Sequence, residues 1–245
     1  MRRHIHMRDV GEGAPLMLLH GGWGYEFYPW ATDDLARDHR ILAPDRAGYG
    51  KSGPGIELSP HFHAMQADAM VALLDIYGVE RAALWGHSDG AVIATLMALR
   101  HPERVSAVVA EANHFDREKP RSRDFFHSMA SSPDDFGERV TAKLAAEHGD
   151  PYWRDVLREG GKAWLMIAVT PQYDFYPGLE NLSVPLLALH GTDDPRTEPG
   201  ELDRLARETK AEIHWVKGGG HSPHTEPAVA AEANRVAAEF LRAHR

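Results

Sequence analysis

Short apolar runs alternate with segments of helical periodicity along most of the chain. Four of these runs have the length of strands buried on both faces, and they cover residues 15–19, 81–85, 105–110 and 185–189. Such strands lie in the middle of a sheet that is covered by helices on both sides. Two further runs, at residues 40–44 and 213–216, predict additional strands.

The segments between these runs carry apolar residues at the spacing of helices, over 30–39, 60–77, 91–100, 200–209 and 228–242. In 60–77 the expected apolar stripe consists of Met65, Ala69, Ala72, Leu73 and Ile76. Returning to a parallel strand needs a long connection, which a helix supplies. The alternation therefore predicts an α/β fold whose central sheet is mostly parallel, has about seven or eight strands and is covered by helices.

Two segments depart from this alternation. Residues 3–8 alternate apolar and polar side chains before the turn-forming Gly11-Glu12-Gly13, which predicts a short edge strand and a hairpin. From 114 to 182 the chain is richer in Arg, Asp, Phe and Trp and has several prolines. We expect a core domain of residues 1–113 and 183–245, with residues 114–182 inserted as a small helical cap over the strand ends.

The segment Gly86-His87-Ser88-Asp89-Gly90 stands between a predicted strand and a predicted helix. A chain that reverses within so few residues leaves no room for Cβ atoms beside the turning serine, so glycine on both sides is a steric requirement. Ser88 is thereby exposed at the tip, in the G-x-S-x-G pattern of a nucleophile elbow. The pentapeptide alone also fits an ordinary strand-to-helix turn, so its meaning depends on the rest of the chain.

A serine hydroxyl needs an adjacent imidazole to take its proton, and that imidazole needs a carboxylate to orient it. Two loops after late strands supply these groups, Asp193-Asp194 in one and His221 in the other, with His224 as a competitor. Each loop follows the carboxyl end of a strand, where ligands bind in open α/β sheets. Asp193 is expected to cap a turn. Glu111, directly after the strand at 105–110, is a different possible acid.

Four motifs occur in a fixed order, and together they resemble the α/β-hydrolase family over nearly all of the chain except the cap. They are His20-Gly21-Gly22, Asp45-Arg46-x-Gly48-Tyr49-Gly50-x-Ser52, the elbow, and Gly191-x-Asp193-Asp194 with Gly220-His221. The resemblance implies that Ser88 is the nucleophile, His221 the general base and Asp194 the orienting acid. It further implies an oxyanion hole made by the backbone N–H groups of Gly22 and Asp89, and no requirement for a metal or an organic cofactor.

Asp89 beside the nucleophile has two interpretations. An anion in the first helical turn is stabilised by the macrodipole by about 0.3–1 kcal/mol, which is a sufficient reason for a carboxylate there. Alternatively, it pairs with a cationic amine on the substrate. The Ser88-Asp89-Gly90 elbow and the Glu111-Ala112-Asn113 segment are similar to those of the valacyclovir-hydrolase-like amino-acid-ester hydrolases. This resemblance implies that Asp89, Glu111 and Asn113 contact the substrate.

Aromatic residues crowd two parts of the chain, and both groups could pack the cap against the core or line an apolar pocket. One group follows the expected oxyanion hole and consists of Trp23, Tyr25, Phe27, Tyr28 and Trp30. The other lies in the expected cap and consists of Phe115, Phe125, Phe126, Trp153 and Trp164. We expect Trp23 to line the substrate pocket.

Composition narrows the choice of partners. The chain has 36 acidic against 27 basic side chains and no basic run, so nucleic acid and anionic membranes are poor partners. The absence of cysteine removes disulfides, thiol catalysis and thiolate metal sites. No apolar h-region follows Met1-Arg2-Arg3-His4, and no run is long enough to span a membrane. We expect a cytoplasmic, soluble monomer or homodimer.

These observations predict a serine hydrolase that acts on a small-molecule carboxylic ester, with a possible preference for aminoacyl esters. Ser88 would be acylated, and water would release the acid with the help of His221. The same scaffold and triad also serve C–C bond hydrolases, lactonases and acyltransferases, so the fold does not decide the reaction. A small-molecule receptor that keeps the triad but turns over slowly is the alternative from another functional class.

Overall fold

The computed structural model describes residues 4–244; residues 1–3 and 245, and with them the start of the first expected strand, lie outside the described part. The strands are β1 (Met7–Val10), β2 (Ala14–Leu19), β3 (His39–Pro44), β4 (Ala82–His87), β5 (Val105–Glu111), β6 (Leu186–Gly191) and β7 (Glu212–Val216). Among the described residues they form one seven-stranded sheet in the order β1-β3-β2-β4-β5-β6-β7. All neighbouring pairs are parallel except β1 and β3, so the mostly parallel sheet is confirmed.

The expected hairpin after the first strand is wrong. β1 pairs with β3, with Met7 opposite Pro44, and β3 separates β1 from β2. The turn instead carries the chain across the start of β3. At Gly11, where φ is +81°, an added Cβ would lie 2.4 Å from the carbonyl oxygen of His39, so only glycine fits this crossing.

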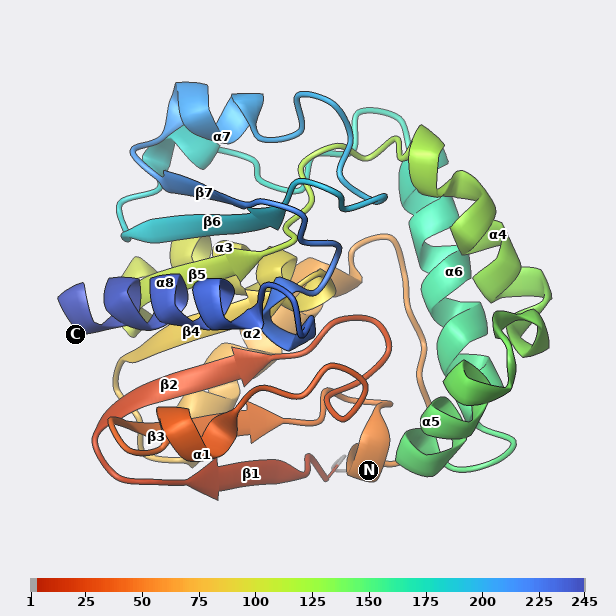
Figure 1. Ribbon diagram of the computed structural model, residues 1–245, viewed down its shortest axis with the longest axis horizontal. Helices are drawn as coiled ribbons and strands as arrows, with labels where there is room; N and C mark the ends of the chain where they lie inside the picture. Colours follow the sequence, from red (N-terminus) through yellow and green to blue (C-terminus); the bar gives the residue numbers. More distant parts are fainter. Residues whose placement is uncertain (1–3, 245) are drawn as a thin grey trace.

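Helices cover both faces of the sheet (Figure 1). Behind it in this view are α2 (Phe62–Ile76) and α3 (Asp89–Arg100), and in front are α1 (Thr32–Leu35) and α8 (Ala230–Ala243). The side chains of β2 alternate between the two layers, as a strand requires. Met17 and Leu19 join the apolar cluster that contains α2 and α3, whereas Leu16 and Leu18 join the cluster that contains α8.

Two helices differ in detail from the expectation. In α2 only Leu73 of the expected stripe is buried, whereas Met65 and Ile76 are 65% and 75% exposed and Ala69 and Ala72 are exposed as well. The buried face, which packs on α3, carries Phe62, His63, Ala67, Met70, Val71, Leu73 and Leu74. α1 has four residues instead of the expected helix over 30–39, and β3 starts at His39, which pairs with Ala14.

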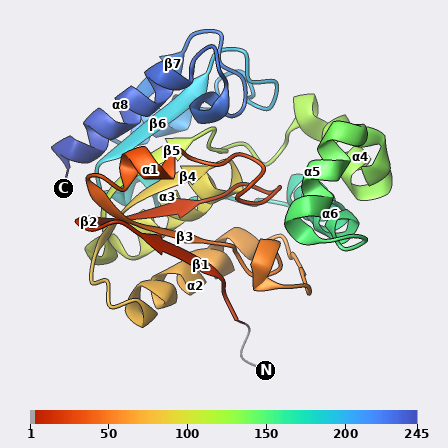
Figure 2. The ribbon, with the colours of Figure 1, turned by 60° about the horizontal axis from the view of Figure 1, so that its bottom comes forward.

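Three helices from the segment expected to form the cap face the carboxyl ends of the parallel strands (Figures 1 and 2). They are α4 (Arg123–Ser131), α5 (Glu138–His148) and α6 (Trp153–Val169). α4 and α6 pack closely at Gly161, where an added Cβ would lie 2.6 Å from the carbonyl oxygen of Phe126. The short helix α7 (Asp203–Glu208) lies in the connection from β6 to β7.

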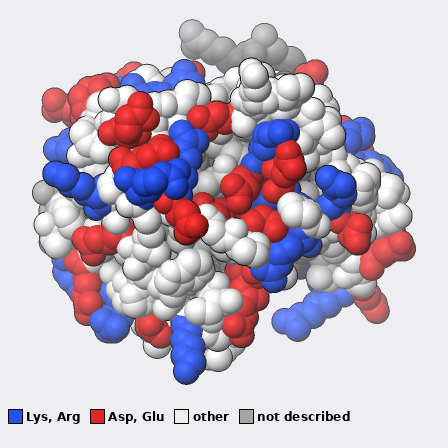
Figure 3. Space-filling model, turned by 90° about the horizontal axis from the view of Figure 1, so that it is seen from above, with Lys and Arg blue, Asp and Glu red and all other residues white. Residues whose placement is uncertain are grey.

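Within residues 4–244, every helix is too short or too polar to cross a lipid bilayer. The chain has a net charge of -9. On the face seen in Figure 3, acidic and basic side chains nevertheless lie next to one another, so that this face carries no large patch of one sign.

Candidate active site

Ser88 lies in the turn between β4 and α3 with φ 54° and ψ -121°. This left-handed conformation costs a non-glycine residue about 1–3 kcal/mol. A Cβ on Gly86 would lie 2.1 Å from the carbonyl oxygen of Gly90, and a Cβ on Gly90 would lie 1.8 Å from that of Leu19. Both positions exclude a side chain, which confirms the steric requirement predicted from the sequence.

Three side chains from the ends of different strands meet at this turn. The hydroxyl of Ser88 lies 3.0 Å from Nε2 of His221, and Nδ1 of His221 lies 2.9 Å from Oδ2 of Asp194. In the arrangement that satisfies both contacts, Nδ1–H donates to the carboxylate and Nε2 accepts from the hydroxyl. His221 is therefore oriented to take the proton of Ser88.

Asp194 is held by two residues that follow it in the same loop, as well as by the imidazole of His221. Its Oδ1 accepts from the backbone N–H of Arg196 at 2.8 Å, and its Oδ2 accepts from the hydroxyl of Thr197 at 3.0 Å. Burial raises the pKa of Asp194, but the neighbouring His221 and the backbone N–H of Arg196 outweigh burial and keep the pKa well below its usual range. Asp193 is exposed and accepts from the hydroxyl of Thr192, which agrees with its expected place in the turn.

The loop of His221 is anchored by His87, which the sequence did not single out. Nε2 of His87 donates to the carbonyl of His221 at 2.9 Å and lies 3.0 Å from the hydroxyl of Ser222. Burial lowers the pKa of His87 to about 3, so its ring is neutral. Burial and the charge of Arg196 also lower the pKa of His221, which keeps its Nε2 free to accept a proton.

The expected oxyanion hole is a pair of backbone N–H groups, those of Gly22 and Asp89. Both residues line the pocket, and within residues 4–244 neither N–H has an acceptor. The loop before Gly22 is fixed by His20, whose Nδ1 donates to the carbonyl of Gly21 at 2.8 Å. The guanidinium of Arg46 donates to the same carbonyl at 2.9 Å. These contacts give the His20-Gly21-Gly22 and Asp45-Arg46 motifs a structural role beside Ser88.

The carboxylate of Asp89 lies in the wall of the pocket but already has partners there. Its Oδ1 accepts from Nε2 of His63 at 3.0 Å and from Nε1 of Trp164 at 3.1 Å, and its Oδ2 lies 4.0 Å from Arg46. Burial raises the pKa of Asp89, but His63 and Arg46 outweigh burial and lower the pKa far below its usual range. His63 and Trp164 come from α2 and α6, and no signal in the sequence linked them to the elbow.

The expected substrate contact of Glu111 is wrong, because its carboxylate points away from the pocket into the core. Oε1 accepts from Nδ1 of His224 at 2.8 Å, and Oε2 accepts from the indole of Trp85 at 3.0 Å. His224 also contacts the carbonyl of Tyr28 at 3.1 Å. Glu111 and His224 therefore satisfy each other, which leaves neither as a partner for Ser88 or His221.

Asn113 does not reach the pocket either. Its Oδ1 accepts from the hydroxyl of Tyr176 at 2.6 Å, and its Nδ2 donates to Thr95 at 3.1 Å, so it braces the end of β5. The next residue, His114, does line the pocket, and its Nε2 lies 3.5 Å from the hydroxyl of Ser88. Burial lowers the pKa of His114 to about 4. No motif in the sequence pointed to His114 as a pocket residue.

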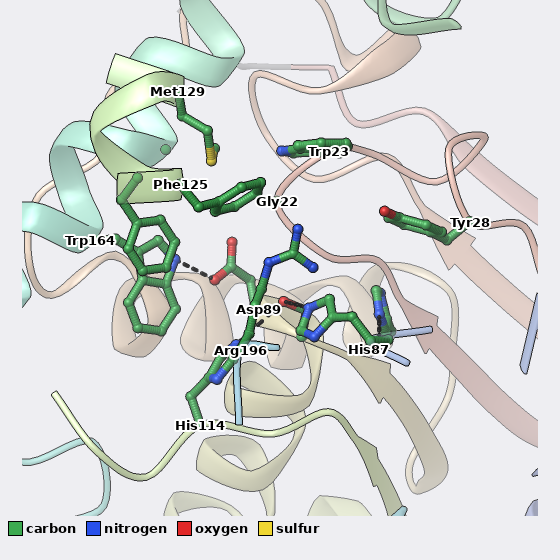
Figure 4. Close-up of a pocket in the computed structure, with 14 residues that line it drawn as sticks. Gly22, Trp23, Tyr28, His87, Asp89, His114, Phe125, Met129, Trp164 and Arg196 are labelled. Carbon is green, nitrogen blue, oxygen red and sulfur yellow. Dashed lines mark hydrogen bonds between the residues drawn. The ribbon is translucent and has the colours of Figure 1, made fainter. Parts of the chain in front are cut away.

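The pocket above Ser88 has about 470 Å³ of unfilled space, counting its open mouth (Figure 4). Its aromatic lining is Trp23, Tyr28, Phe125, Phe126 and Trp164. Trp23 lines this pocket, and its contact with a substrate stays a prediction. The other aromatic residues of both groups pack inside the protein instead. Tyr25 and Trp30 belong to the apolar cluster that contains α8, and Phe115 and Trp153 belong to the cluster that contains α2 and α3. Phe27 packs against Trp23.

No group of three or more His, Asp or Glu side chains in residues 4–244 is placed to hold a metal ion. The groups available for chemistry in the pocket are therefore the hydroxyl, the imidazoles, two free backbone N–H groups and the charged side chains of Asp89 and Arg196.

Residues 14–161, more than half of the chain, match the family model described as the alpha/beta hydrolase fold. A bifunctional esterase/perhydrolase of Acinetobacter calcoaceticus is 29% identical over 97% of this chain and 96% of its own length. A 2-hydroxymuconate semialdehyde hydrolase of a Pseudomonas strain is 37% identical, but over only 44% of this chain and 39% of its own length. A thermophilic esterase of Thermogutta terrifontis shares the fold with a TM-score of 0.74 at 21% identity, covering 98% of this chain and 94% of that chain.

Proposed function

The chain belongs to the alpha/beta-hydrolase family and is a hydrolase of that fold, and within this family we propose that it cleaves small carboxylic esters through an acyl-enzyme on Ser88. The observation that carries the proposal is the hydrogen-bonded series from Asp194 through His221 to Ser88. A neutral imidazole with a fixed tautomer, beside a hydroxyl at the base of a small pocket, is suited to acyl transfer.

The reaction would proceed in two halves. Ser88 Oγ bonds to the ester carbonyl carbon while its proton passes to His221 Nε2, and the carbonyl oxygen becomes an anion that accepts from Gly22 and Asp89 N–H. The tetrahedral species then expels the alcohol, which takes the proton from His221. Water attacks the acyl-enzyme, gives a proton to the same imidazole, and the carboxylic acid leaves as Ser88 regains its proton.

The preference for aminoacyl esters expected from the sequence rests on Asp89 as the partner of a substrate amine. The contacts of Asp89 weaken that idea, because His63 and Trp164 donate to its carboxylate and Arg46 lies nearby. Its charge is offset within the protein, so it is a poor partner for an ammonium group. Comparing aminoacyl with neutral esters in Asp89→Asn and wild-type protein tests this preference.

The relatives include epoxide hydrolases as well as esterases, and the reaction is therefore assigned from the site. The side chain at the elbow is a serine with an imidazole partner, which forms an acyl-enzyme, and this favours ester cleavage over epoxide opening. The C–C bond hydrolases and lactonases use the same triad, so the turnover test below has to separate them from an esterase. A cytoplasmic location, a small-molecule ester as the only partner, and a monomer or homodimer stay predictions.

The test labels one sample of the protein with a fluorophosphonate and measures turnover of p-nitrophenyl acetate and butyrate with a second, unlabelled sample. The proposal expects stoichiometric labelling on Ser88, multiple turnovers, and loss of both in Ser88→Ala. Labelling without turnover of any ester would favour a receptor with a retained triad. Turnover that persists in Ser88→Ala would contradict the proposal.

A further inference from the structure

The guanidinium of Arg196 points into the pocket and has no anionic partner there (Figure 4). Its Cζ lies 4.1 Å from the centre of the Phe125 ring, so the side chain is held against an aromatic face. Among the residues that the structure describes, 4–244, no carboxylate oxygen lies within 4.0 Å of the guanidinium, and its N–H groups have no acceptor.

The backbone of Arg196 fixes where this group stands. Its N–H donates to Oδ1 of Asp194 at 2.8 Å, and its carbonyl accepts from the ammonium of Lys119 at 3.2 Å. Asp194 uses its other oxygen for His221 and Thr197. The nearest carboxylate is therefore committed to orienting the imidazole, and the guanidinium two residues later is left to face the pocket.

The charge of Arg196 contrasts with that of Asp89 across the same pocket. Asp89 accepts hydrogen bonds from His63 and Trp164 and has Arg46 beside it, so its charge is offset. The guanidinium of Arg196 stacks on an aromatic ring, and the nearby carboxylate of Asp194 attracts it without forming an ion pair. Among the residues that line the pocket, Arg196 is therefore the charged group that is left without a hydrogen-bonded partner, and its charge is positive.

We propose that Arg196 binds a carboxylate group of the substrate, so that the preferred esters are half-esters of small dicarboxylic acids. This inference rests on the proposed ester hydrolysis and specifies its substrate class. A guanidinium offers paired N–H donors whose geometry matches the two oxygens of a carboxylate, and charge-assisted pairs of this kind are strong in a partly buried site. The free carboxylate would lie at Arg196 while the ester group of the same molecule lies at Ser88.

A second consequence concerns His221. The charge of Arg196 is one of the causes that lower the pKa of His221. A carboxylate bound at Arg196 offsets that charge, so the bound anion raises the pKa of the imidazole. This effect can be measured without turnover.

The kinetic test compares mono-p-nitrophenyl glutarate with p-nitrophenyl valerate, two esters of equal acyl length that differ in the terminal carboxylate. We expect the wild type to prefer the glutarate half-ester in kcat/KM, and Arg196→Gln to lower that preference by roughly ten- to a hundredfold. Arg196→Lys should keep part of it. Arg123→Gln removes the same charge from an exposed position on α4 and should leave the preference as in the wild type.

If the valerate ester is turned over and the ratio of kcat/KM for the glutarate half-ester to that for the valerate ester is equal in wild type and Arg196→Gln, the inference is overturned. The proposed function then stays intact. If neither ester is hydrolysed, the proposed function fails and binding decides the inference. Glutarate should then shift the His221 ring resonances of the wild type and raise the pKa that NMR titration reports for this ring. Folded Arg196→Gln should need a much higher glutarate concentration for the same resonance shift, and Arg196→Lys an intermediate one. Glutarate binding of equal strength in wild type and both variants would overturn it.

Discussion

Nε2 of His221 lies 3.0 Å from the hydroxyl oxygen of Ser88, although the two residues are 133 positions apart in the sequence. The contact exists because β4 and β7 both end at the same edge of the parallel sheet, where Ser88 follows β4 and the loop with His221 follows β7. Asp194, in the loop after β6, completes the series at 2.9 Å.

The paired aspartates allow a matched test of this series. Asp194→Asn should lower kcat for p-nitrophenyl butyrate by about 10⁴-fold, because an amide can hold His221 in the wrong tautomer. Asp193→Asn changes the same charge in an exposed turn position and should leave kcat within about twofold of the wild type. Equal losses in the two variants would show that Asp194 does not orient the base.

The pH profile of kcat/KM follows from the environment of His221. Burial and the charge of Arg196 lower the pKa of this imidazole below its ordinary value of 6.5. Nε2 accepts a proton only when the ring is neutral, so the midpoint of the acidic limb of kcat/KM should lie below pH 6.5. In Arg196→Gln the acidic limb should move to higher pH. An acidic limb above pH 7 in the wild type, measured on a neutral ester, would contradict this assignment.

The glycines of the elbow should not tolerate alanine. Gly86→Ala and Gly90→Ala drive a Cβ to 2.1 Å and 1.8 Å from backbone oxygens that cannot move aside easily. We expect a loss in the free energy of unfolding of more than about 3 kcal/mol, or failure to fold. Gly55→Ala is the control, since its φ is also positive, at +106°, but nothing lies within 4 Å of the added Cβ. It should cost about 1 kcal/mol, as measured by chemical denaturation.

Glu147, at the end of α5, predicts a pH dependence of stability. Its Oε1 accepts from the backbone N–H of Glu26 at 2.9 Å, and burial raises the pKa of its carboxyl to about 7, against 4.5 for the ordinary value. The folded state therefore holds the proton more tightly than the unfolded state. The carboxyl costs nothing extra below about pH 4.5, destabilises the fold increasingly as pH rises from there to about 7, and has a constant cost above that.

Glu147→Gln removes this penalty while keeping an acceptor for Glu26. The variant should gain about 1–2 kcal/mol over the wild type at pH 8 and little at pH 5, as followed by thermal denaturation. Glu138→Gln, at an exposed position in the first turn of the same helix, should show no such difference between the two pH values. A gain for Glu147→Gln that is equal at both pH values would contradict the raised pKa.

The sequence by itself determined the features that depend on steric limits between neighbouring residues and on the order of strands, helices and loops along the chain. The elbow could be predicted because the bulk excluded by Gly86 and Gly90 belongs to a turn whose strand and helix are adjacent in sequence. The loops that carry Asp194 and His221 could be predicted to meet because loops after parallel strands open on one edge of the sheet. The choice of Asp194 over Asp193 and of His221 over His224 came from the family resemblance. The sheet itself could be predicted from the alternation of strands and helices, because a return to a parallel strand needs a connection as long as a helix.

Only the tertiary structure decided which side chains from distant elements meet, because the number of residues between two such elements does not determine how they pack. Glu111 and His224 follow different strands, and both side chains turn inward because each can satisfy the other in the core. Asp89 acquired partners from α2 and α6, and Arg196 was left without one, since these contacts depend on how the cap helices pack over the strand ends. Local propensity places a residue on an element, but packing between distant elements determines what its side chain meets.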